Sequence, residues 1–274
     1  MLIKKQEIEK LSDDIRKIID GQERDLRDNR EGVLGILKND IHTLATLKNE
    51  QVNSFQRERD LMSETLANIS HQLKTPLTSM MIMADLLEDA PPERREEFLS
   101  NIKLGLVRME WLVSTLLKMA KLDAGVIEFS AEKIQASELV NLAFEPVQIL
   151  FDMKDQRVEC SCETELLCDK QWTVEALTNI LKNASEYSPE GGAVTIRSGV
   201  DPLCKWISVT DSGEGLTNTQ IANLFKRFEG SRSDKGYGIG LPLALAIVRG
   251  QNGDVDVKGG GDGYGATFTL KFYK

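Results

Sequence analysis

Long apolar segments are missing from this sequence of 274 residues. It has no run of about 18 or more apolar residues and no signal-peptide pattern, so we expect no part of the chain to cross a membrane. Cysteine is also scarce, and no Cys-x-x-Cys pair is matched by a second pair or by histidines. This pattern argues against a zinc site and favours reduced, partly buried thiols at Cys160, Cys162, Cys168 and Cys204.

Positive charge is in the minority, with 34 Lys and Arg against 43 Asp and Glu and a net charge of -9. The acidic balance argues against nucleic-acid binding and against simple adhesion to an anionic membrane. The length exceeds the usual size of one domain, so we expect two or three units.

Apolar residues recur at helical spacing through residues 1–60, in two stretches. The first stretch runs from Leu2 to about Asp20, and the second begins at Leu34 after a glycine and a polar connector. Each stripe is the narrow seam of a helix that needs a partner helix. We therefore expect coiled-coil helices in a helix, connector, helix arrangement.

Residues 61–125 predict a helical hairpin. A further helix, which carries apolar residues from Phe55 onward, runs to about Asp89, and Pro91 and Pro92 stop it. The return helix keeps near-heptad spacing and ends around Gly125. Two amphipathic helices form too thin a core, so two chains are expected to pair as a homodimer with a four-helix bundle.

The hydrophobic period changes after Gly125, where strand-like runs alternate with helical patterns over residues 126–274. The expected strands are Val126–Phe129, Arg157–Cys162, Ala193–Ser198, Trp206–Thr210, Gly253–Val257 and Thr267–Phe272, and the expected helices are Ser137–Leu150, Gln171–Ala184 and Pro242–Arg249. Strict βαβ alternation is missing. This favours an α/β domain with a mixed sheet that helices cover on one face.

The chain has two histidines, and His71 stands in an unusual setting. Ile69 and Leu73 share the buried stripe of a helix, which places His71 on its flank with Thr75 one turn later. Pro76 predicts a kink just beyond. A reactive histidine and an accidental surface histidine both fit this segment by itself. His42 lies beside an apolar seam with no partner motif, and we expect it to be structural.

Three polar or glycine-rich segments follow in order. Asn179 and Asn183 lie one helical turn apart, which suits Mg²⁺ with phosphates, although the pair by itself favours two solvated asparagines. Asp211 follows an apolar strand and precedes Gly213 and Gly215, where the backbone can approach a flat ligand. The third segment holds Gly236, Gly238 and Gly240 before a helix, where free N–H groups can meet phosphate.

Together these segments resemble the sensor histidine kinases of two-component systems. Their H box, N box, first glycine box, phenylalanine segment, second glycine box and last glycine box stand in this order over residues 61–274. The resemblance implies a HisKA-type dimerisation domain at 61–125 and a Bergerat-type α/β sandwich that binds ATP at 126–274. Residues 1–60 resemble the second half of a HAMP-type relay, with Glu31 and Gly32 in place of its acidic-glycine signature.

The resemblance assigns roles to residues of both domains. His71 is expected to attack the γ-phosphoryl group, Gln72 to orient the ring, and Thr75 to place a water that dephosphorylates the response regulator. The expected nucleotide-binding residues are Asn179, Asn183, Tyr187, Asp211, Gly213, Gly215, Arg227, Gly236, Gly238, Gly240 and Thr267. Among them Asn183 is the magnesium ligand, Asp211 and Thr267 face adenine, and Arg227 contacts phosphate. Residues 216–235 are expected to form a lid over ATP.

The expected activity is autophosphorylation on His71 from Mg-ATP, followed by transfer to an aspartate of a response regulator. The resemblance also implies that the chain is the soluble, cytoplasmic part of a membrane protein, with an input domain upstream. Three departures from the family pattern, Gln72, Glu186 and Gly230, leave open a catalytically weak scaffold that binds nucleotide and relays conformation. An ATPase clamp fits poorly, because the positions for its glutamate base hold Asn179 and Ile180.

Overall fold

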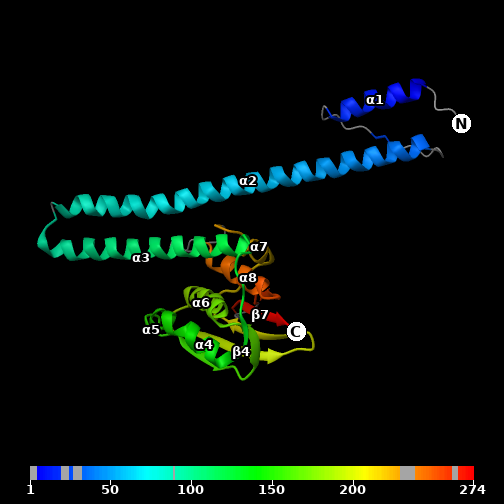
Figure 1. The fold of residues 1–274 in the computed structure, drawn as a ribbon. Coiled ribbons are helices and arrows are strands. Elements are labelled where there is room, and N and C mark those ends of the chain that lie inside the picture. The colour runs from blue at the N-terminus through cyan, green and yellow to red at the C-terminus, as the bar shows by residue number, and fades with distance from the viewer. Residues whose placement is uncertain (1–4, 20–24, 27–32, 89, 229–237, 261–264) are drawn as a thin grey trace. The chain divides into compact units, whose positions relative to one another are not determined.

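The computed structural model describes residues 5–19, 25–26, 33–88, 90–228, 238–260 and 265–274. The chain divides into two units, Met1–Asn68 and Ile69–Lys274, and each is described by itself. No helix within the described ranges is long and apolar enough to cross a membrane. The second unit holds both the helical hairpin and the α/β domain (Figure 1).

The first unit contains α1 (Lys5–Ile19) and the N-terminal part of α2 (Val33–Glu88). The two stretches that we expected from Leu34 and from Phe55 join in one helix of 56 residues, because no glycine or proline lies between Gly35 and Pro76. His42 lies beside Asp25, with 4.0 Å between Nε2 and Oδ1. Glu31 and Gly32 fall outside the described residues.

The hairpin of the second unit is formed by α2 from Ile69 onward and by α3 (Pro92–Asp123). Proline at the start of α3 and Glu93 in its first turn suit the N-terminus of a helix. Gly105 lets Met80 pack closely between the two helices, since a Cβ there would meet the methionine sulfur at 2.5 Å. Many apolar side chains nevertheless stay exposed on the hairpin, among them Leu77, Met81, Leu86, Leu106, Val107 and Leu117.

The α/β domain contains a two-stranded sheet and a five-stranded mixed sheet, which confirms the predicted fold class. In the small sheet β1 (Ala131–Gln135) pairs antiparallel with β3 (Glu165–Asp169). The large sheet has the order β2-β4-β5-β7-β6, and only the β2–β4 pair within it is parallel. Its strands are β2 (Arg157–Ser161), β4 (Ala193–Val200), β5 (Cys204–Thr210), β6 (Gly253–Lys258) and β7 (Thr267–Tyr273).

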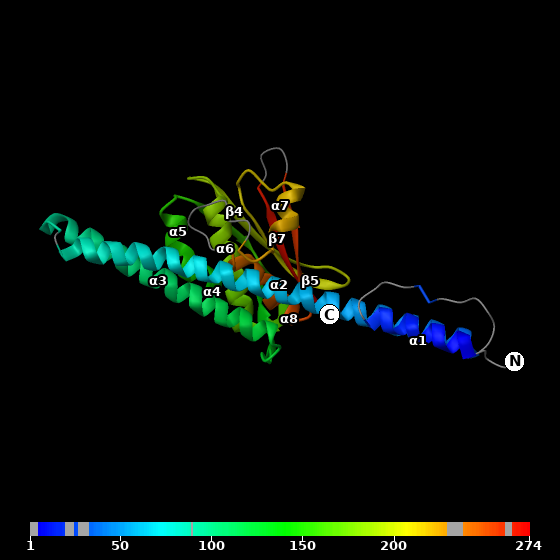
Figure 2. The ribbon, with the colours of Figure 1, turned by 90° about the horizontal axis from the view of Figure 1, so that it is seen from above.

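Helices pack on one face of the large sheet, as Figures 1 and 2 show. Alternate residues of β4, β5 and β7, such as Ile196, Ile207 and Leu270, are fully buried against α6 and α8. The helices of this domain are α4 (Ala136–Phe144), a 3-10 turn η1 (Glu145–Val147), α5 (Gln148–Asp152), α6 (Lys170–Tyr187), α7 (Asn218–Asn223) and α8 (Gly240–Gly250).

Several predicted elements differ in detail. The expected strand Val126–Phe129 has no regular secondary structure, and the first strand of the domain, β1, begins at Ala131. The expected helix Ser137–Leu150 is interrupted at the 3-10 turn, because Pro146 lacks the N–H that a continuous helix needs. The prediction omitted β3 and α7. All four cysteines are free, and three of them are buried.

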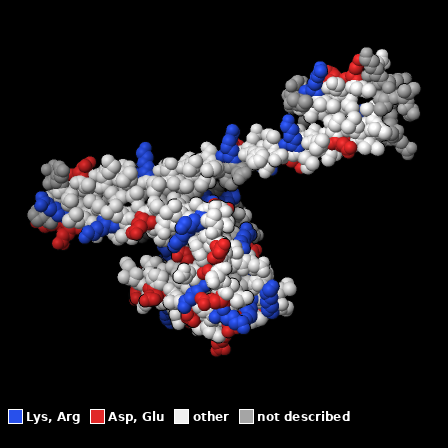
Figure 3. Space-filling model, viewed as in Figure 1, with Lys and Arg blue, Asp and Glu red and all other residues white. Residues whose placement is uncertain are grey.

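Acidic and basic side chains are interspersed on the face of the α/β domain in Figure 3. Within the domain, ion pairs such as Lys170 with Glu138 and Lys271 with Asp256 bring opposite charges together. On this face charge does not gather by sign.

Candidate functional site

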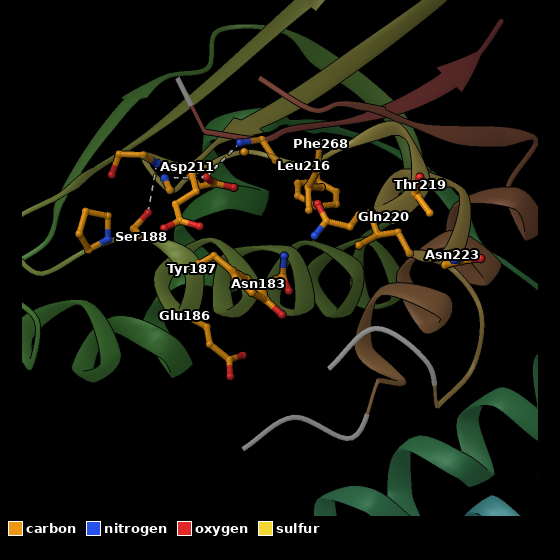
Figure 4. Close-up of a pocket in the computed structure, with 17 residues that line it drawn as sticks. Asn183, Glu186, Tyr187, Ser188, Asp211, Leu216, Thr219, Gln220, Asn223 and Phe268 are labelled. Atoms are coloured by element: carbon orange, nitrogen blue, oxygen red, sulfur yellow. Dashed lines mark hydrogen bonds between the residues drawn. The ribbon is translucent and has the colours of Figure 1, made fainter. Parts of the chain in front are cut away.

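A cavity of about 910 Å³ lies where the ends of β5, β7 and α6 meet α7. Figure 4 shows Asn183 on α6 at one side of it, Asp211 and Phe268 across from it, and Gln220 of α7 beside them. The lining residues are Asn183, Glu186, Tyr187, Ser188, Pro189, Asp211, Ser212, Gly213, Glu214, Gly215, Leu216, Thr219, Gln220, Asn223, Leu224, Ala266 and Phe268. The volume is in the range of pockets that bind cofactors and other small molecules.

Asp211 is the buried charged residue of the cavity, with 6% of its surface exposed. It comes directly after β5 and continues the alternation of Ile207 and Val209, which turns its side chain to the face that the helices cover. Its Oδ1 accepts hydrogen bonds from the backbone N–H of Gly213 at 2.9 Å and of Ala266 at 3.0 Å. Burial raises the pKa of the carboxyl, and the two backbone hydrogen bonds oppose that shift.

Two glycines allow the backbone to close around Asp211. A Cβ on Gly213 would lie 2.6 Å from the Tyr187 carbonyl oxygen, and a Cβ on Gly265 would collide with Asp211 itself. Both residues must therefore lack a side chain. The sequence indicated Gly213 as a position where the backbone can approach a flat ligand, and it did not single out Gly265.

The two asparagines of α6 differ in environment. Asn183 lines the cavity (Figure 4), but Asn179 does not, and 8% of its surface is exposed. The Nδ2 of Asn179 donates to the Glu175 carbonyl at 2.9 Å. A Cβ on Gly240 would lie 2.9 Å from the Asn179 Oδ1, so this amide packs against the first residue of α8.

The C-terminal end of α6 forms one wall of the cavity through Tyr187 and Ser188. Ser188 Oγ accepts a hydrogen bond from the N–H of Ser212 at 3.2 Å, which ties this wall to the residue after Asp211. Ser212 Oγ in turn accepts from the N–H of Ala193 at the start of β4, at 3.0 Å. The sequence prediction named Tyr187 but missed both serines, which carry no motif signal of their own.

Another wall is α7, which lies within residues 216–235, the segment that the sequence prediction assigned to a lid over ATP. Thr217 and Gln220 form a capping box at its start, with bonds of 3.3 Å and 2.8 Å between each side chain and the other's backbone N–H. A Thr followed three residues later by Gln is a recognised signal for a helix start, and it could have revealed α7. Thr219 and Asn223 line the cavity from this helix.

Thr267 differs from the expectation that it faces adenine. Its neighbours Ala266 and Phe268 line the cavity, whereas Thr267 Oγ1 lies 2.9 Å from Thr210 Oγ1 and borders a shallow groove that Trp206 also lines. Side chains of a strand alternate between the two faces of the sheet. A shift of one residue in register therefore decides whether a side chain faces the cavity, as Phe268 does, or the opposite groove, as Thr267 does. The backbone N–H that reaches Asp211 belongs to Ala266, which brings no hydroxyl.

The expected phosphate-side residues are only partly brought together. Arg227 does not line the cavity, and its guanidinium pairs with Asp123 at the end of α3. Gly238 has a positive φ of 65° and its carbonyl accepts from the N–H of Phe228, while Gly240 begins α8. Gly236, Gly230 and the end of the expected lid, residues 229–235, lie outside the described residues.

The expected phospho-acceptor segment lies on α2 in the second unit. His71 and Thr75 are exposed and Gln72 is half-buried. The Thr75 hydroxyl donates to the His71 carbonyl at 3.2 Å, as expected for residues one helical turn apart. Pro76 stands inside the helix.

The chemistry of the cavity fits a nucleotide better than a metal alone. No group of three or more His, Cys, Asp or Glu that could hold a metal occurs among the described residues. Mg²⁺ in nucleotide sites needs only one or two protein oxygens, because water and phosphates supply the rest. The Asn183 amide at the wall can supply one such oxygen, and the Asp211 carboxylate at the closed side can accept a hydrogen bond from a nucleotide base.

Two family models match the chain. Residues 61–125 match the His Kinase A (phospho-acceptor) domain, and residues 168–274 match the histidine kinase-, DNA gyrase B- and HSP90-like ATPase. The first range contains His71 and both helices of the hairpin. The second contains every residue that lines the cavity.

Individual proteins agree with these models. The chain is 32% identical over 225 residues to the sensor histidine kinase WalK of Bacillus subtilis, which is 76% of this chain and 36% of WalK. Full-length ShkA in complex with AMPPNP has a TM-score of 0.57 and 26% identity, over 76% of this chain and 45% of that chain.

The histidine kinase ThkA, solved in complex with the response regulator TrrA, has a TM-score of 0.64 over 83% of this chain and 66% of that chain. At 19% identity it shows the fold alone. The chain spans between 36% and 57% of the length of three of its most similar curated relatives.

Proposed function

We propose that this chain, which belongs to the sensor histidine kinases of two-component systems as a transmitter region, transfers the γ-phosphoryl group of ATP to His71 and then to an aspartate of a response regulator. The observation that carries this proposal is the cavity closed by Asp211, in a chain that also exposes His71 on a helix of the phospho-acceptor domain. One chain therefore holds both a site for the phosphoryl donor and an acceptor.

The nucleotide is proposed to enter the cavity with its base against Asp211. Both backbone N–H groups that reach the carboxylate bond to Oδ1, which leaves Oδ2 to accept the exocyclic amine of adenine. The ring of Phe268 lines the same space and offers an apolar face to the base. Asn183 lies on the opposite side, where its amide oxygen can serve as the magnesium ligand.

The phosphates are proposed to extend toward Gly238 and Gly240 at the start of α8. The first N–H groups of a helix have no intrahelical partners, and they offer hydrogen bonds and a positive dipole end to phosphate. A bound Mg²⁺ would offset charge on the β- and γ-phosphates. Arg227 is proposed to contact phosphate as well, after it has left Asp123.

The reaction at His71 is an in-line displacement. One ring nitrogen of the neutral imidazole attacks the γ-phosphorus, a nitrogen–phosphorus bond forms, and the bond to the bridging oxygen of ADP breaks. The oxygen of Gln72 is proposed to accept a hydrogen bond from the N–H of the other ring nitrogen, and that proton leaves to water as the nitrogen–phosphorus bond forms. An amide cannot take that proton, so we expect slower autophosphorylation than with a carboxylate.

A homodimer is the proposed working state. The exposed apolar side chains of α2 and α3 would pair with those of a second copy in a four-helix bundle, with residues 61–125 as the dimerisation and phosphotransfer part. Residues 1–60 are proposed to be the relay that changes this bundle, and an anchored input domain is proposed to act on the relay. The proposed partner is a response regulator that docks on the hairpin; ThkA, which shares the fold, was solved in complex with a response regulator.

Following the phosphoryl group tests this function. The dimer is incubated with Mg²⁺ and γ-labelled ATP, and a receiver domain is then added. We expect label on the chain that moves to the receiver, and none in an Asn183→Ala variant that keeps its fold. ATP binding without any label would favour the alternative, a nucleotide-binding scaffold that relays conformation.

A further inference from the structure

The last turn of α6 is held by side chains from a distant part of the chain. No basic residue stands in the last turn of this helix, and its final carbonyls have no intrahelical partner. Lys154, which follows α5, places its Nζ 2.7 Å from the Ser185 carbonyl oxygen, 3.0 Å from that of Glu186 and 3.2 Å from that of Ser188. All three hydrogens of the ammonium group therefore have an acceptor at the negative end of the helix dipole.

Gln156 adds a second set of bonds to the same segment. Its Nε2 lies 2.9 Å from the Ser185 carbonyl oxygen, 3.0 Å from that of Ser188 and 3.2 Å from that of Pro189. Its Oε1 accepts the Ser185 hydroxyl at 2.7 Å, and 8% of the glutamine surface is exposed. We call Lys154 and Gln156 the α6 clamp.

The segment that the α6 clamp holds is a wall of the cavity. Glu186, Tyr187, Ser188 and Pro189 line the cavity, although neither clamp residue does. Ser188 connects onward through its Oγ to the N–H of Ser212, next to Asp211. The clamp thus lies behind the wall and is linked to the adenine side of the cavity by one hydrogen bond.

We propose that Lys154 and Gln156 are positioning residues for ATP, which fix the end of α6 so that Tyr187 and Ser188 are in place before the nucleotide arrives. This rests on the ATP-binding part of the proposed function. Without the clamp, the carbonyls of the last turn must find water, and the wall must be ordered by the nucleotide at the expense of affinity. The effect is on binding, so KM for ATP should change while kcat stays near that of the wild type.

The test measures ATP affinity by calorimetry and the unfolding temperature without nucleotide, on the whole chain. We expect Lys154→Met to weaken ATP binding about tenfold, because three hydrogen bonds of a charged donor are lost. Lys154→Arg, which keeps the charge and the donors, should recover most of the affinity. Lys205→Met is the matched control, since Lys205 also donates to a backbone carbonyl, that of Glu165, and does not line the cavity. It should leave ATP affinity within about twofold of the wild type.

If Lys154→Met does not fold, Gln156→Met tests the same proposal. This variant removes the polar atoms of the glutamine and keeps a side chain of similar shape. Weaker ATP binding by Gln156→Met at a temperature where it is folded supports the proposal. Unchanged affinity in both clamp variants, with only a lower unfolding temperature, would show that the clamp is merely structural and would overturn it. A wild-type chain that binds no ATP would instead refute the proposed function.

Discussion

The guanidinium group of Arg227 forms a bidentate ion pair with the carboxylate of Asp123. Nη1 lies 2.8 Å from Oδ2 and Nη2 lies 2.7 Å from Oδ1, in the two-pronged geometry that arginine also uses for phosphate. Asp123 is the last residue of α3, so the pair joins the helical hairpin to the segment after α7. While the pair is formed, this guanidinium is not available to a nucleotide.

Breaking the ion pair of Arg227 with Asp123 should lower the KM for ATP, because it releases the guanidinium group for phosphate. In Asp123→Asn the side chain keeps its shape but loses the charge that holds Arg227. The pair is partly exposed, at 38% and 48% of the two side chains, so we expect a fall in KM for ATP of only about two- to fivefold. The measurement is the initial rate of autophosphorylation against ATP concentration.

The control for this variant is Asp254→Asn, which weakens the exposed pair of Arg249 with Asp254, whose Nε and Oδ1 are 3.0 Å apart. It should leave KM unchanged. A KM for ATP in Asp123→Asn that equals or exceeds the wild-type value would mean that Asp123 does not compete with phosphate.

Asp211→Asn should lower the affinity for ATP while it keeps the hydrogen bonds that hold the side chain in place. The amide oxygen can still accept from Gly213 and Ala266, while the new NH₂ group would face the exocyclic amine of adenine. We expect ATP affinity to fall by about 30-fold or more, because two donors then meet and neither is satisfied. Calorimetric titration with ATP measures the loss, and unchanged affinity would remove Asp211 as the adenine acceptor.

The pH dependence of folding gives an independent check on Asp211. Burial raises its pKa above the ordinary value of 3.8, so its contribution to stability is greatest below 3.8 and is lost as the pH rises through the raised value. At neutral pH the Asp211→Asn variant should therefore match or exceed the wild type in unfolding temperature. Its advantage should shrink as the pH falls toward 3.8. An advantage that grows on acidification would contradict the direction of the shift.

Thr75→Ala should distinguish kinase from phosphatase activity. Its exposed hydroxyl donates to the backbone carbonyl of His71, whereas the phosphoryl group is expected on the ring of that residue. We expect autophosphorylation within about twofold of the wild type and a loss of about tenfold or more in dephosphorylation of the receiver. Thr78→Ala, on the same helix and also exposed, is the control that should change neither activity. Parallel loss of both activities in Thr75→Ala would show a general defect.

Gln72→Glu should speed autophosphorylation, since a carboxylate can both orient the ring of His71 and accept its proton. We expect a gain of roughly three- to tenfold in kcat, with KM for ATP unchanged. Single-turnover labelling at saturating ATP measures it. An unaltered rate would mean that Gln72 does not limit the reaction.

Much of the fold follows from patterns that are local in the sequence. The prolines at 91 and 92, the helical seams and the alternating strands predict the hairpin and the mixed sheet, and the structure confirms both. Asp211 and Asn183 also come together as lining residues, because a polar residue after a buried strand and one on an amphipathic helix meet at the same edge.

What escaped prediction depends on register and on distant contacts. Thr267 and Ala266 differ by one position, and only the pairing of β5 with β7 decides which one faces the cavity. The partner of Arg227 is 104 residues away in the sequence, and the carbonyls that Lys154 holds are 31 to 34 residues away. Neither contact can be read from neighbouring residues in the sequence, because only the packing of whole helices and strands brings its residues together.

The most direct measurement maps the residue that receives phosphate. The chain contains two histidines, so His71→Gln and His42→Gln form a matched pair for labelling with Mg²⁺ and γ-labelled ATP. We expect acid-labile, alkali-stable label on His71 in the wild type and in His42→Gln, and none in His71→Gln. Label that persists in His71→Gln, or its complete absence from a wild-type chain that binds ATP, would show that His71 is not the phospho-acceptor.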